Sequence, residues 1–409
     1  MKNNFKFFTL AALAAAAVFT SCSDDDSDNG DAIVSELPAV ISEDTTLVAG
    51  TYSLSGSCHV TNGATLTIKP GVTIEAVYDS VFDYILIEQG AKIYAVGEAN
   101  NPIVMTSANA SDGWGGLHLC GYAPINGGST TALSEIGEST YGGTSSTDNS
   151  GTLKYVRIEN SGKTISSEKE ANGFSFYGVG SGTSVSYCQA YGGSDDGFEF
   201  FGGTVNISYC VVVDCTDDSF DWTQGWRGSA NYILAIQSEG SDCDCLMECD
   251  NSGSNNAYTP VSRPTIKNAT LIGDGDGKGI RLREGTQVEL ENVIVANAAS
   301  ALVVESQLTH ASLTNVWDNA DFSSLITSWT STDKDQSVLS SVAISSDITS
   351  TFDSTYDTAY QYTSSMFTAA GNYTNQAFTE GAEYYILTTS DVTGAFGGSD
   401  WTEGAWCIL

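Results

Sequence analysis

The chain has 409 residues, of which 50 are acidic and 15 are lysine or arginine, and its formal net charge is −35 at neutral pH. A surface this acidic repels nucleic acid and anionic glycans and attracts divalent cations, so a nucleic-acid-binding function is excluded. Apolar residues make up 41% of the chain, and 42 glycines beside 6 prolines favour many short strands joined by turns, not helices.

The N-terminus has the layout of a bacterial lipoprotein signal peptide. Two basic residues, Lys2 and Lys6, precede an apolar run over 7–19 that is too short to span a bilayer, and Cys22 follows at the expected cleavage point. We therefore predict that residues 1–21 are a signal peptide and that Cys22 is acylated after cleavage. The alternative is an ordinary signal peptide followed by an incidental cysteine.

Residues 22–45 form a predicted acidic, flexible tether that begins with the run Ser-Asp-Asp-Asp-Ser-Asp at 23–28. Such a run after an acylated cysteine resembles the surface-export signal of Bacteroidota lipoproteins, although a plain solvated linker has the same composition. The export interpretation predicts a protein that is lipid-anchored in the outer membrane and faces the cell exterior. No other segment of the sequence is long and apolar enough to cross a membrane.

An internal repeat determines the predicted architecture. Residues 185–206 and 207–228 align without gaps at a spacing of 22, and 279–286 matches 197–204. Each unit holds short alternating apolar segments separated by Gly, Asn or Asp, which indicates strands with one buried face and leaves no room for a crossover helix. The repeat therefore predicts an all-β fold, a right-handed parallel β-helix with about 22 residues per rung, over residues 46–320.

Two segments interrupt the repeat and a third follows it. Residues 121–150 and 250–263 are rich in Gly, Ser and Asn and are predicted to leave the coil as loops. Residues 321–409 lose the repeat and are predicted to form a β-rich cap region that packs on the last rungs, with an independent second domain as the alternative. The aromatic residues of 394–406 are expected to be buried.

Four motifs occur together in this chain. They are Asp-Gly-Trp-Gly-Gly at 112–116, the two related turns at 195–199 and 217–221, the segment 279–286 and the ending 394–406. In this combination the chain resembles a group of uncharacterised β-helix lipoproteins of Bacteroidota. The resemblance extends over nearly all of the mature chain and implies a pectate-lyase-like β-helix shape, but it implies no catalytic residues.

The repeat places acidic residues above one another on adjacent rungs. Phe198 and Phe200 should point inward and Glu199 outward, and one rung later Asp221 takes the outward position. Carboxylates on strands about 4.8 Å apart repel each other by about 1 kcal/mol in water and by more inside a protein. They are expected to splay, share protons or bind a cation, and calcium suits such oxygen ligands. The predicted calcium ligands are Asp195, Asp196, Glu199, Asp217, Asp218 and Asp221; alternatively, these residues cap turns through hydrogen bonds to the backbone.

The same acids allow an enzymatic interpretation. Asp196, Asp217 and Asp218, together with Arg281, resemble the acidic and basic motifs of β-helix glycosidases of the polygalacturonase type. The expected His-Gly turn between them is missing, and the three histidines, at positions 59, 118 and 310, lie elsewhere in the sequence. Arg281 takes the outward position that corresponds to Glu199. There it either acts as a base or, as the sequence favours, pairs with the stacked acids and ends their row.

Cysteine and tryptophan supply weaker signals. Nine cysteines remain besides Cys22, and the crowded segment 243–249 matches no common zinc-ligand spacing, which favours disulfides or buried cysteines. Trp222, Trp226 and Arg227 are a candidate glycan-stacking platform, with packing in the core as the alternative.

Together these features predict a non-enzymatic cell-surface lipoprotein with a structural, adhesive or glycan-binding role, one version of which is calcium-dependent assembly of a surface layer. Its predicted partners are the outer membrane, through the lipid anchor, and either further copies of itself or surface glycans. The alternative is a polysaccharide-acting hydrolase or lyase that uses the stacked acidic residues.

Overall fold

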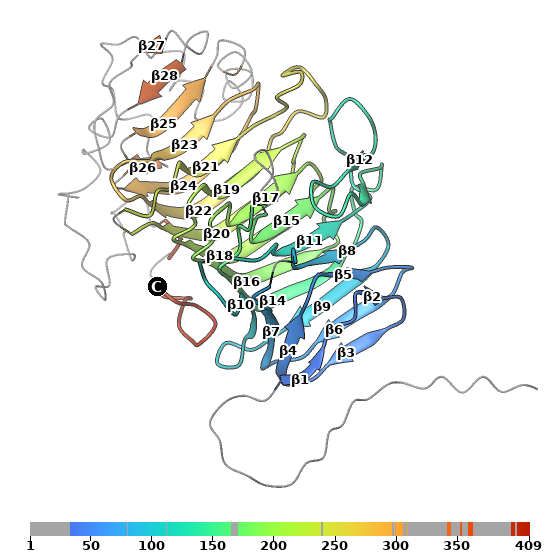
Figure 1. The fold of residues 1–409 in the computed structure, drawn as a ribbon. Helices are drawn as coiled ribbons and strands as arrows, with labels where there is room; N and C mark the ends of the chain where they lie inside the picture. Colours follow the sequence, from blue (N-terminus) through green and yellow to red (C-terminus); the bar gives the residue numbers. More distant parts are fainter. Residues whose placement is uncertain are drawn as a thin grey trace, which may run out of the picture.

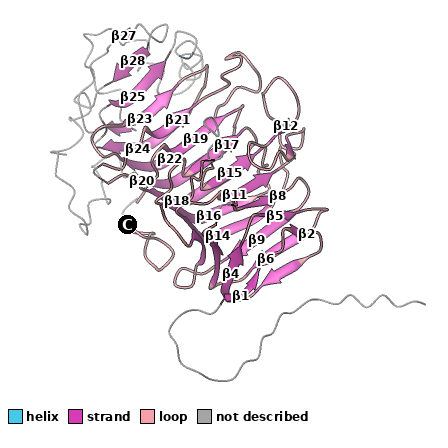
Figure 2. Cartoon of the chain, viewed as in Figure 1, coloured by secondary structure: helices cyan, strands magenta, loops and turns pink. Residues whose placement is uncertain are grey.

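The computed structural model describes residues 33–305 except 80, 112, 165–170, 239, 297 and 299, together with 309, 342–344, 352–353, 359–362, 394–396 and 399–409. In these residues the chain is a right-handed parallel β-helix, which confirms the predicted fold class. The rungs stack in chain order from β1 to β25, and Figures 1 and 2 show the strands side by side along the coil. The predicted signal peptide, Cys22 and His310 lie outside the described residues.

Two large sheets form the coil. The 14-stranded sheet contains β1 (Ile33–Glu36), β3 (Thr45–Leu47), β4 (Gly50–Leu54), β6 (Thr65–Ile68), β7 (Val72–Ala76), β9 (Lys92–Val96), β10 (Ile103–Ser107), β14 (Gly151–Glu159), β16 (Ser184–Tyr191), β18 (Asn206–Val213), β20 (Ser229–Ile236), β22 (Thr265–Ile272), β24 (Glu289–Ala296) and β26 (Val342–Ile344). The 12-stranded sheet contains β2 (Val40–Ile41), β5 (Ser57–Val60), β8 (Tyr84–Ile87), β11 (Leu117–Cys120), β15 (Phe174–Tyr177), β17 (Phe198–Phe201), β19 (Asp218–Thr223), β21 (Cys245–Cys249), β23 (Lys278–Leu282), β25 (Ser300–Glu305), β28 (Ala359–Tyr362) and β27 (Phe352–Asp353). A separate hairpin pairs β12 (Ala132–Leu133) with β13 (Thr140–Tyr141). No helix in the described residues is long and apolar enough to cross a membrane.

The 14-stranded sheet bends along one line, so that each rung has three sides. The first half of β14 pairs with β9 and its second half with β10. Tyr155 lies between the halves with a φ of 51°, and later rungs repeat this left-handed conformation at the residues Tyr187, Tyr209, Tyr232, Asn268 and Asn292. Such a conformation costs a non-glycine residue about 1 kcal/mol. The four tyrosine rings stack with centroids 4.7–4.8 Å apart, and this stacking stabilises the bend.

The interior of the coil contains the inward side chains of both sheets, in the register that the 22-residue repeat predicts. Phe198 of β17 lies opposite Phe220 of β19, and Glu199 lies opposite Asp221 on the outward side. The Phe198 ring stacks on Phe220 with centroids 5.5 Å apart and on Phe174 of the preceding rung at 4.5 Å. Burial of these aromatic stacks fixes the register, because a shift by one residue would turn every phenylalanine outward.

The motif at 112–116 has a structural role. Trp114 is fully buried, and its Nε1 donates a hydrogen bond to the carbonyl of Glu159 at 2.9 Å. A Cβ at position 116, where φ is 69°, would lie 2.0 Å from the carbonyl oxygen of Asn172, so only glycine fits there. Asp112 lies outside the described residues.

Both loops that interrupt the repeat leave the coil as predicted, and they contact each other. Ile125 and Tyr141 of the first loop pack on the outward side chains of the 12-stranded sheet, among them Tyr177 and Phe201. Asn126 Nδ2 donates to Oδ1 of Asn251 in the second loop at 2.6 Å and to the carbonyl of Pro260 at 2.9 Å. The loops therefore form one wall beside the outer face of this sheet.

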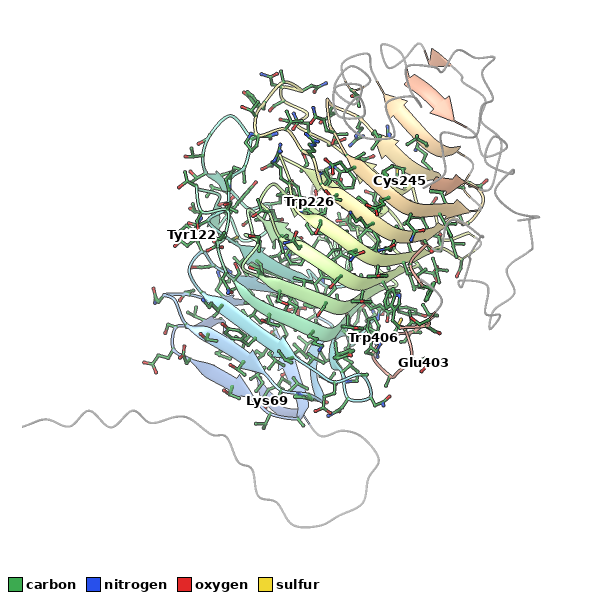
Figure 3. All side chains as sticks on the ribbon, turned by 180° about the vertical axis from the view of Figure 1, so that it is seen from behind. Lys69, Tyr122, Trp226, Cys245, Glu403 and Trp406 are labelled. Atoms are coloured by element: carbon green, nitrogen blue, oxygen red, sulfur yellow. The ribbon has the colours of Figure 1, made fainter. Side chains whose placement is uncertain are left out.

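The last residues of the chain pack on the outer face of the 14-stranded sheet. Figure 3 shows Trp406 at this face, where it is fully buried. Its ring meets Tyr155 and Tyr187 edge to face, with centroids 5.9 and 5.8 Å apart. The backbone of Ile408 exchanges two hydrogen bonds with the side chain of Gln189, at 2.6 and 2.9 Å. Of the aromatic residues of this segment, Phe396 and Trp406 are buried as expected, and Trp401 is partly buried. Most of 321–393 lies outside the described residues, and the predicted domain boundaries stay predictions.

We expect Trp406→Ala to lower the free energy of unfolding by about 3–5 kcal/mol, because it leaves a large cavity over the tyrosine stack. Urea unfolding followed by circular dichroism would measure the change. Tyr78→Ala, which truncates a side chain that is 67% exposed, should cost less than about 0.5 kcal/mol. Equal losses in the two variants would contradict the role assigned to the C-terminal segment.

Candidate functional site

The outward side of the 12-stranded sheet holds a concentration of acidic residues between β15 and β23. One column of outward positions runs through Ser175, Glu199, Asp221, Glu248 and Arg281 on five successive rungs. The turns before these strands add further carboxyls. We call the whole set the acidic face; its members are Asp195, Asp196, Glu199, Asp217, Asp218, Asp221, Asp244, Glu248 and Asp250. It contains all six of the predicted calcium ligands.

The six predicted ligands are distributed over two groups that share one residue and a third group that extends beyond the prediction. Asp195, Asp196 and Asp217 each place a carboxylate oxygen within 4.8 Å of the others, and so do Asp196, Glu199 and Asp221. Asp218 belongs to the third group, together with Asp244, Cys245 and Glu248. Asp196 is thus the residue that the first two groups share, while Asp218 belongs with residues of the next rung.

The hydrogen bonds of the acidic face support the turn-capping alternative only in part. Asp196 Oδ1 accepts a hydrogen bond from the backbone N–H of Asp218 at 3.0 Å. Asn172 Nδ2 donates to Glu199 Oε2 at 2.5 Å. In contrast, the buried Oδ1 atoms of Asp218 and Asp221 have no hydrogen-bond partner. Two carboxylates of the face are therefore left with an unsatisfied oxygen, which capping does not explain.

Burial shifts the titration of these acids. It raises the pKa of Asp196, Glu199, Asp218 and Asp221 well above the usual values, and repulsion from neighbouring carboxylates raises each pKa further. In the absence of a cation, these shifts therefore favour protonated over ionised carboxyls on the acidic face. A bound divalent cation would favour the ionised state instead.

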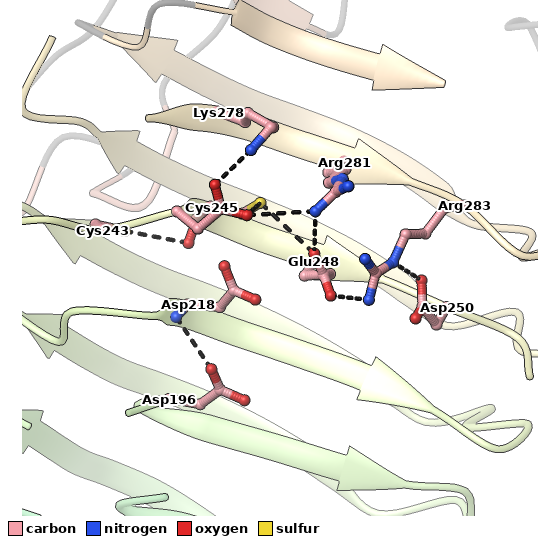
Figure 4. A network of polar contacts seen from close by, with 10 residues as sticks. Asp196, Asp218, Cys243, Cys245, Glu248, Asp250, Lys278, Arg281 and Arg283 are labelled. Atoms are coloured by element: carbon pink, nitrogen blue, oxygen red, sulfur yellow. Dashed lines mark hydrogen bonds and ion pairs between the residues drawn. The ribbon is translucent and has the colours of Figure 1, made fainter. Parts of the chain in front are cut away.

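Three cations close the face at its C-terminal end (Figure 4). Arg281 Nη1 lies 2.8 Å from Glu248 Oε1 and 3.3 Å from Asp244 Oδ2, which is the charge-pairing arrangement that the sequence favoured. Arg283 Nε donates to Asp250 Oδ1 at 2.7 Å and also pairs with Glu248, and Lys278 pairs with Asp244.

The pKa values of the paired acids reflect both burial and these cations. Burial raises the pKa of Glu248 to about 7 and that of Asp250 to about 6, although Arg283 opposes both shifts. Burial also acts on Asp244, but the hydrogen bond and charge of Lys278 outweigh it and lower the pKa of that carboxyl.

Sequence reasoning missed several members of this site, namely Asn172, Asp244, Glu248, Asp250 and Lys278, whereas Arg283 belongs to the Arg281-Leu282-Arg283 segment that resembles the basic motif of the glycosidases. A signal for Glu248 was present, because Met247-Glu248-Cys249 repeats the apolar–acidic–apolar pattern of 198–200. Glu248 follows Asp221 by 27 positions, and this departure from the 22-residue spacing hid the match. Asn172 lies in the turn before β15, where no repeat predicts its neighbour.

The predicted glycan-stacking platform is wrong for its two tryptophans. Trp222 and Trp226 belong to the hydrophobic core, where Trp226 stacks on Phe200 with centroids 4.0 Å apart. Trp222 Nε1 donates to Thr286 Oγ1 at 3.1 Å, also inside the coil. Neither ring is accessible to a glycan in solvent. Arg227 is exposed and donates from Nη1 to the carbonyl of Val261 at 3.0 Å.

The histidines and cysteines lie mostly apart from the acids. His59 and His118 occupy the same outward column on earlier rungs, with Leu86 between them and Ser175 after His118. Burial lowers the pKa of His118 to about 4. Nine described cysteines are free of disulfides, and eight of them are buried. Of these, Cys245 alone belongs to a described cluster of metal-ligating side chains.

Comparison with known proteins agrees with this architecture. A family model described as a pectate-lyase like beta helix domain matches residues 39–406. No curated protein and no solved structure matches the chain significantly. Because the family model extends over most of its length, the chain belongs to the pectate-lyase-like β-helix family.

Proposed function

We propose that the protein is a lipid-anchored component of the bacterial cell surface, with a non-enzymatic structural or adhesive role that depends on calcium held by the acidic face. The signal-peptide layout of 1–21 and Cys22 supports the anchor, and the acidic run at 23–28 supports export to the outer side of the outer membrane. The family fits this role and a polysaccharide-acting role equally, so the choice between them depends on the site.

The observation that carries the proposal is the pair of overlapping carboxylate groups around Asp196. In each group the oxygens lie within 4.8 Å of one another. Calcium binds oxygens at about 2.3–2.6 Å, so two oxygens on one ion are at most about 5 Å apart. Both groups meet this limit with little rearrangement.

Charge and rigidity favour a cation in these groups. The cations described for the face pair with Asp244, Glu248 and Asp250, which lie on a later rung than the groups around Asp196. Glu199 and Asp221 are held on adjacent strands of a rigid sheet, so their mutual repulsion cannot be relieved by moving apart. A calcium ion would remove this repulsion.

The test uses soluble protein that carries Cys22→Ala, with light scattering and thermal unfolding recorded while calcium is added and then chelated. We expect a reversible growth in mass and a higher Tm, because a ligand at 100 times its Kd stabilises the folded state by about 2.7 kcal/mol. Assembly follows if calcium bridges the acidic faces of two copies.

A matched pair of variants locates the effect. Asp196→Asn with Asp221→Asn should abolish both responses, since it removes one ligand from the first group and two from the second. Glu36→Gln with Glu403→Gln removes the same charge from exposed positions away from the acidic face and should leave the responses intact. A monomer whose Tm ignores calcium would refute the proposal.

One observation favours an enzymatic role as the second candidate. Glu199 and Asp221 are carboxyls on neighbouring rungs, and a carboxyl pair that shares one proton can supply both an acid and a base for glycoside cleavage. Release of reducing ends from neutral or acidic polysaccharides, abolished by Glu199→Gln, would establish this role. Cleavage that Glu199→Gln leaves unchanged would place any activity elsewhere.

A further inference from the structure

Cys245 differs from the other cysteines of its segment. Cys243 and Cys249 belong to the hydrophobic core of the coil, whereas Cys245 does not, although it is fully buried. It is the first residue of β21, and its register neighbours are Asp218 on the rung before and Lys278 on the rung after. Its Sγ lies 3.5 Å from Asp244 Oδ2 and 3.9 Å from Glu248 Oε1. The thiol thus lies among carboxyls.

Four potential metal ligands converge at this point. One carboxylate oxygen from each of Asp218, Asp244 and Glu248 and the Sγ of Cys245 lie within 4.8 Å of one another. They come from two adjacent rungs, and Figure 4 shows Asp218, Cys245 and Glu248 near the basic residues that end the acidic face. Pairing with Lys278 and Arg281 orients the carboxylates of Asp244 and Glu248 before any metal binds.

A second, independent observation points to a ligand here. Asp218 is 4% exposed, and its Oδ1 accepts no hydrogen bond. A buried carboxylate oxygen without a partner costs about 1–3 kcal/mol or more, because the water that it loses on folding is not replaced. The charge and coordination of a metal ion would replace that water.

We infer that Asp218, Asp244, Cys245 and Glu248 form a binding site for a thiophilic divalent cation such as Zn²⁺ or Cd²⁺. Thiolate selects such metals over calcium, and four ligands of this kind suit tetrahedral coordination. On binding, a metal–sulfur bond replaces the S–H bond of Cys245, and the proton passes to the solvent. This site shares no residue with the two groups proposed for calcium, so either proposal can fail without the other.

The test follows the ultraviolet sulfur-to-cadmium charge-transfer band while Cd²⁺ is added to metal-free Cys22→Ala protein. Calcium is present in excess, so that the all-oxygen groups are occupied, and thiol reductants are absent. We expect the band to saturate at one Cd²⁺ per chain, with release of the Cys245 thiol proton and of any protons held by the ligating carboxyls. Absence of the band up to millimolar Cd²⁺ would overturn the inference.

Three variants locate the sulfur and the free carboxylate. Cys245→Ser should abolish the band, while Cys249→Ser, which changes an equally buried cysteine of the same strand, should retain it. Asp218→Asn should weaken Cd²⁺ binding at least about tenfold, since even partners outside the ligand shell contribute that much. A band that survives Cys245→Ser would assign the sulfur elsewhere and refute the site.

X-ray absorption at the cadmium edge of the unmutated site keeps the inference testable if a variant does not fold. One sulfur and oxygen ligands in the first shell would support it. A first shell without sulfur, or with several sulfurs, would overturn it. Calcium-induced assembly of Cys245→Ser protein should match that of the parent, which separates this site from the proposed function.

Discussion

Metal-free protein is expected to unfold at a lower temperature at pH 8 than at pH 5, and calcium is expected to reverse the difference. Burial raises the pKa of Asp196, Glu199, Asp218 and Asp221 in the folded state. A raised carboxyl pKa means that the folded chain binds protons more tightly than the unfolded chain, whose carboxyls titrate near pH 4. Their stabilising contribution is therefore complete below about pH 4 and is lost as the pH rises through the raised values.

Each unit by which burial raises a carboxyl pKa favours the protonated folded chain by about 1.4 kcal/mol, and the four carboxyls shift in the same direction, so Tm should fall measurably from pH 5 to pH 8. Scanning calorimetry between pH 5 and pH 8, with a chelator or with calcium, measures the effect. Asp196→Asn with Asp221→Asn should flatten the profile of the metal-free protein. A metal-free Tm that rises with pH would show that these acids are ionised and stabilised by other groups.

The fold was predictable because its information is local and repeated. Gap-free alignment of 185–206 with 207–228 determined both the strand period and the register, and the structure places Glu199 opposite Asp221 as that register requires. The inward aromatics followed from the same alternation. The register of a solenoid can be predicted from its repeat because each rung contacts mainly the neighbouring rungs.

The candidate site was predictable only where the repeat continued without interruption. The loop before β21 interrupts the 22-residue spacing. For this reason the repeat did not predict that Glu248 and Cys245 belong to the site. The contact between Asn126 and Asn251 joins residues 125 positions apart, and that between Gln189 and Ile408 joins residues 219 apart. Neither arises from a local pattern. Trp226 was predicted to be exposed but lies in the core. It follows a strand, so no alternating pattern indicates whether its side chain points inward or outward.

Arg283→Ala is expected to be among the most destabilising single substitutions on the acidic face, with a loss of about 3–5 kcal/mol at pH 8. Arg283 pairs with both Glu248 and Asp250, whose side chains are 11% and 10% exposed. Removal of Arg283 leaves the buried carboxylate of Asp250 without this cation, while Glu248 keeps Arg281 as a partner, and an uncompensated buried charge is costly. Urea unfolding at fixed pH and calcium concentration measures the loss.

Two comparisons distinguish this explanation from a loss of packing. Arg263→Ala truncates the same side chain in an ion pair with Glu289 that is 34% and 42% exposed, and it should cost at most about 1 kcal/mol. At pH 5, the loss caused by Arg283→Ala should shrink. The pKa values of Glu248 and Asp250, about 7 and about 6 with Arg283 present, can only rise when this cation is removed, so both acids become neutral. A loss that is equally large at both pH values would mean that Arg283 stabilises the rungs through the contacts of its aliphatic stem, and that the acids at this end of the face are not ionised at pH 8.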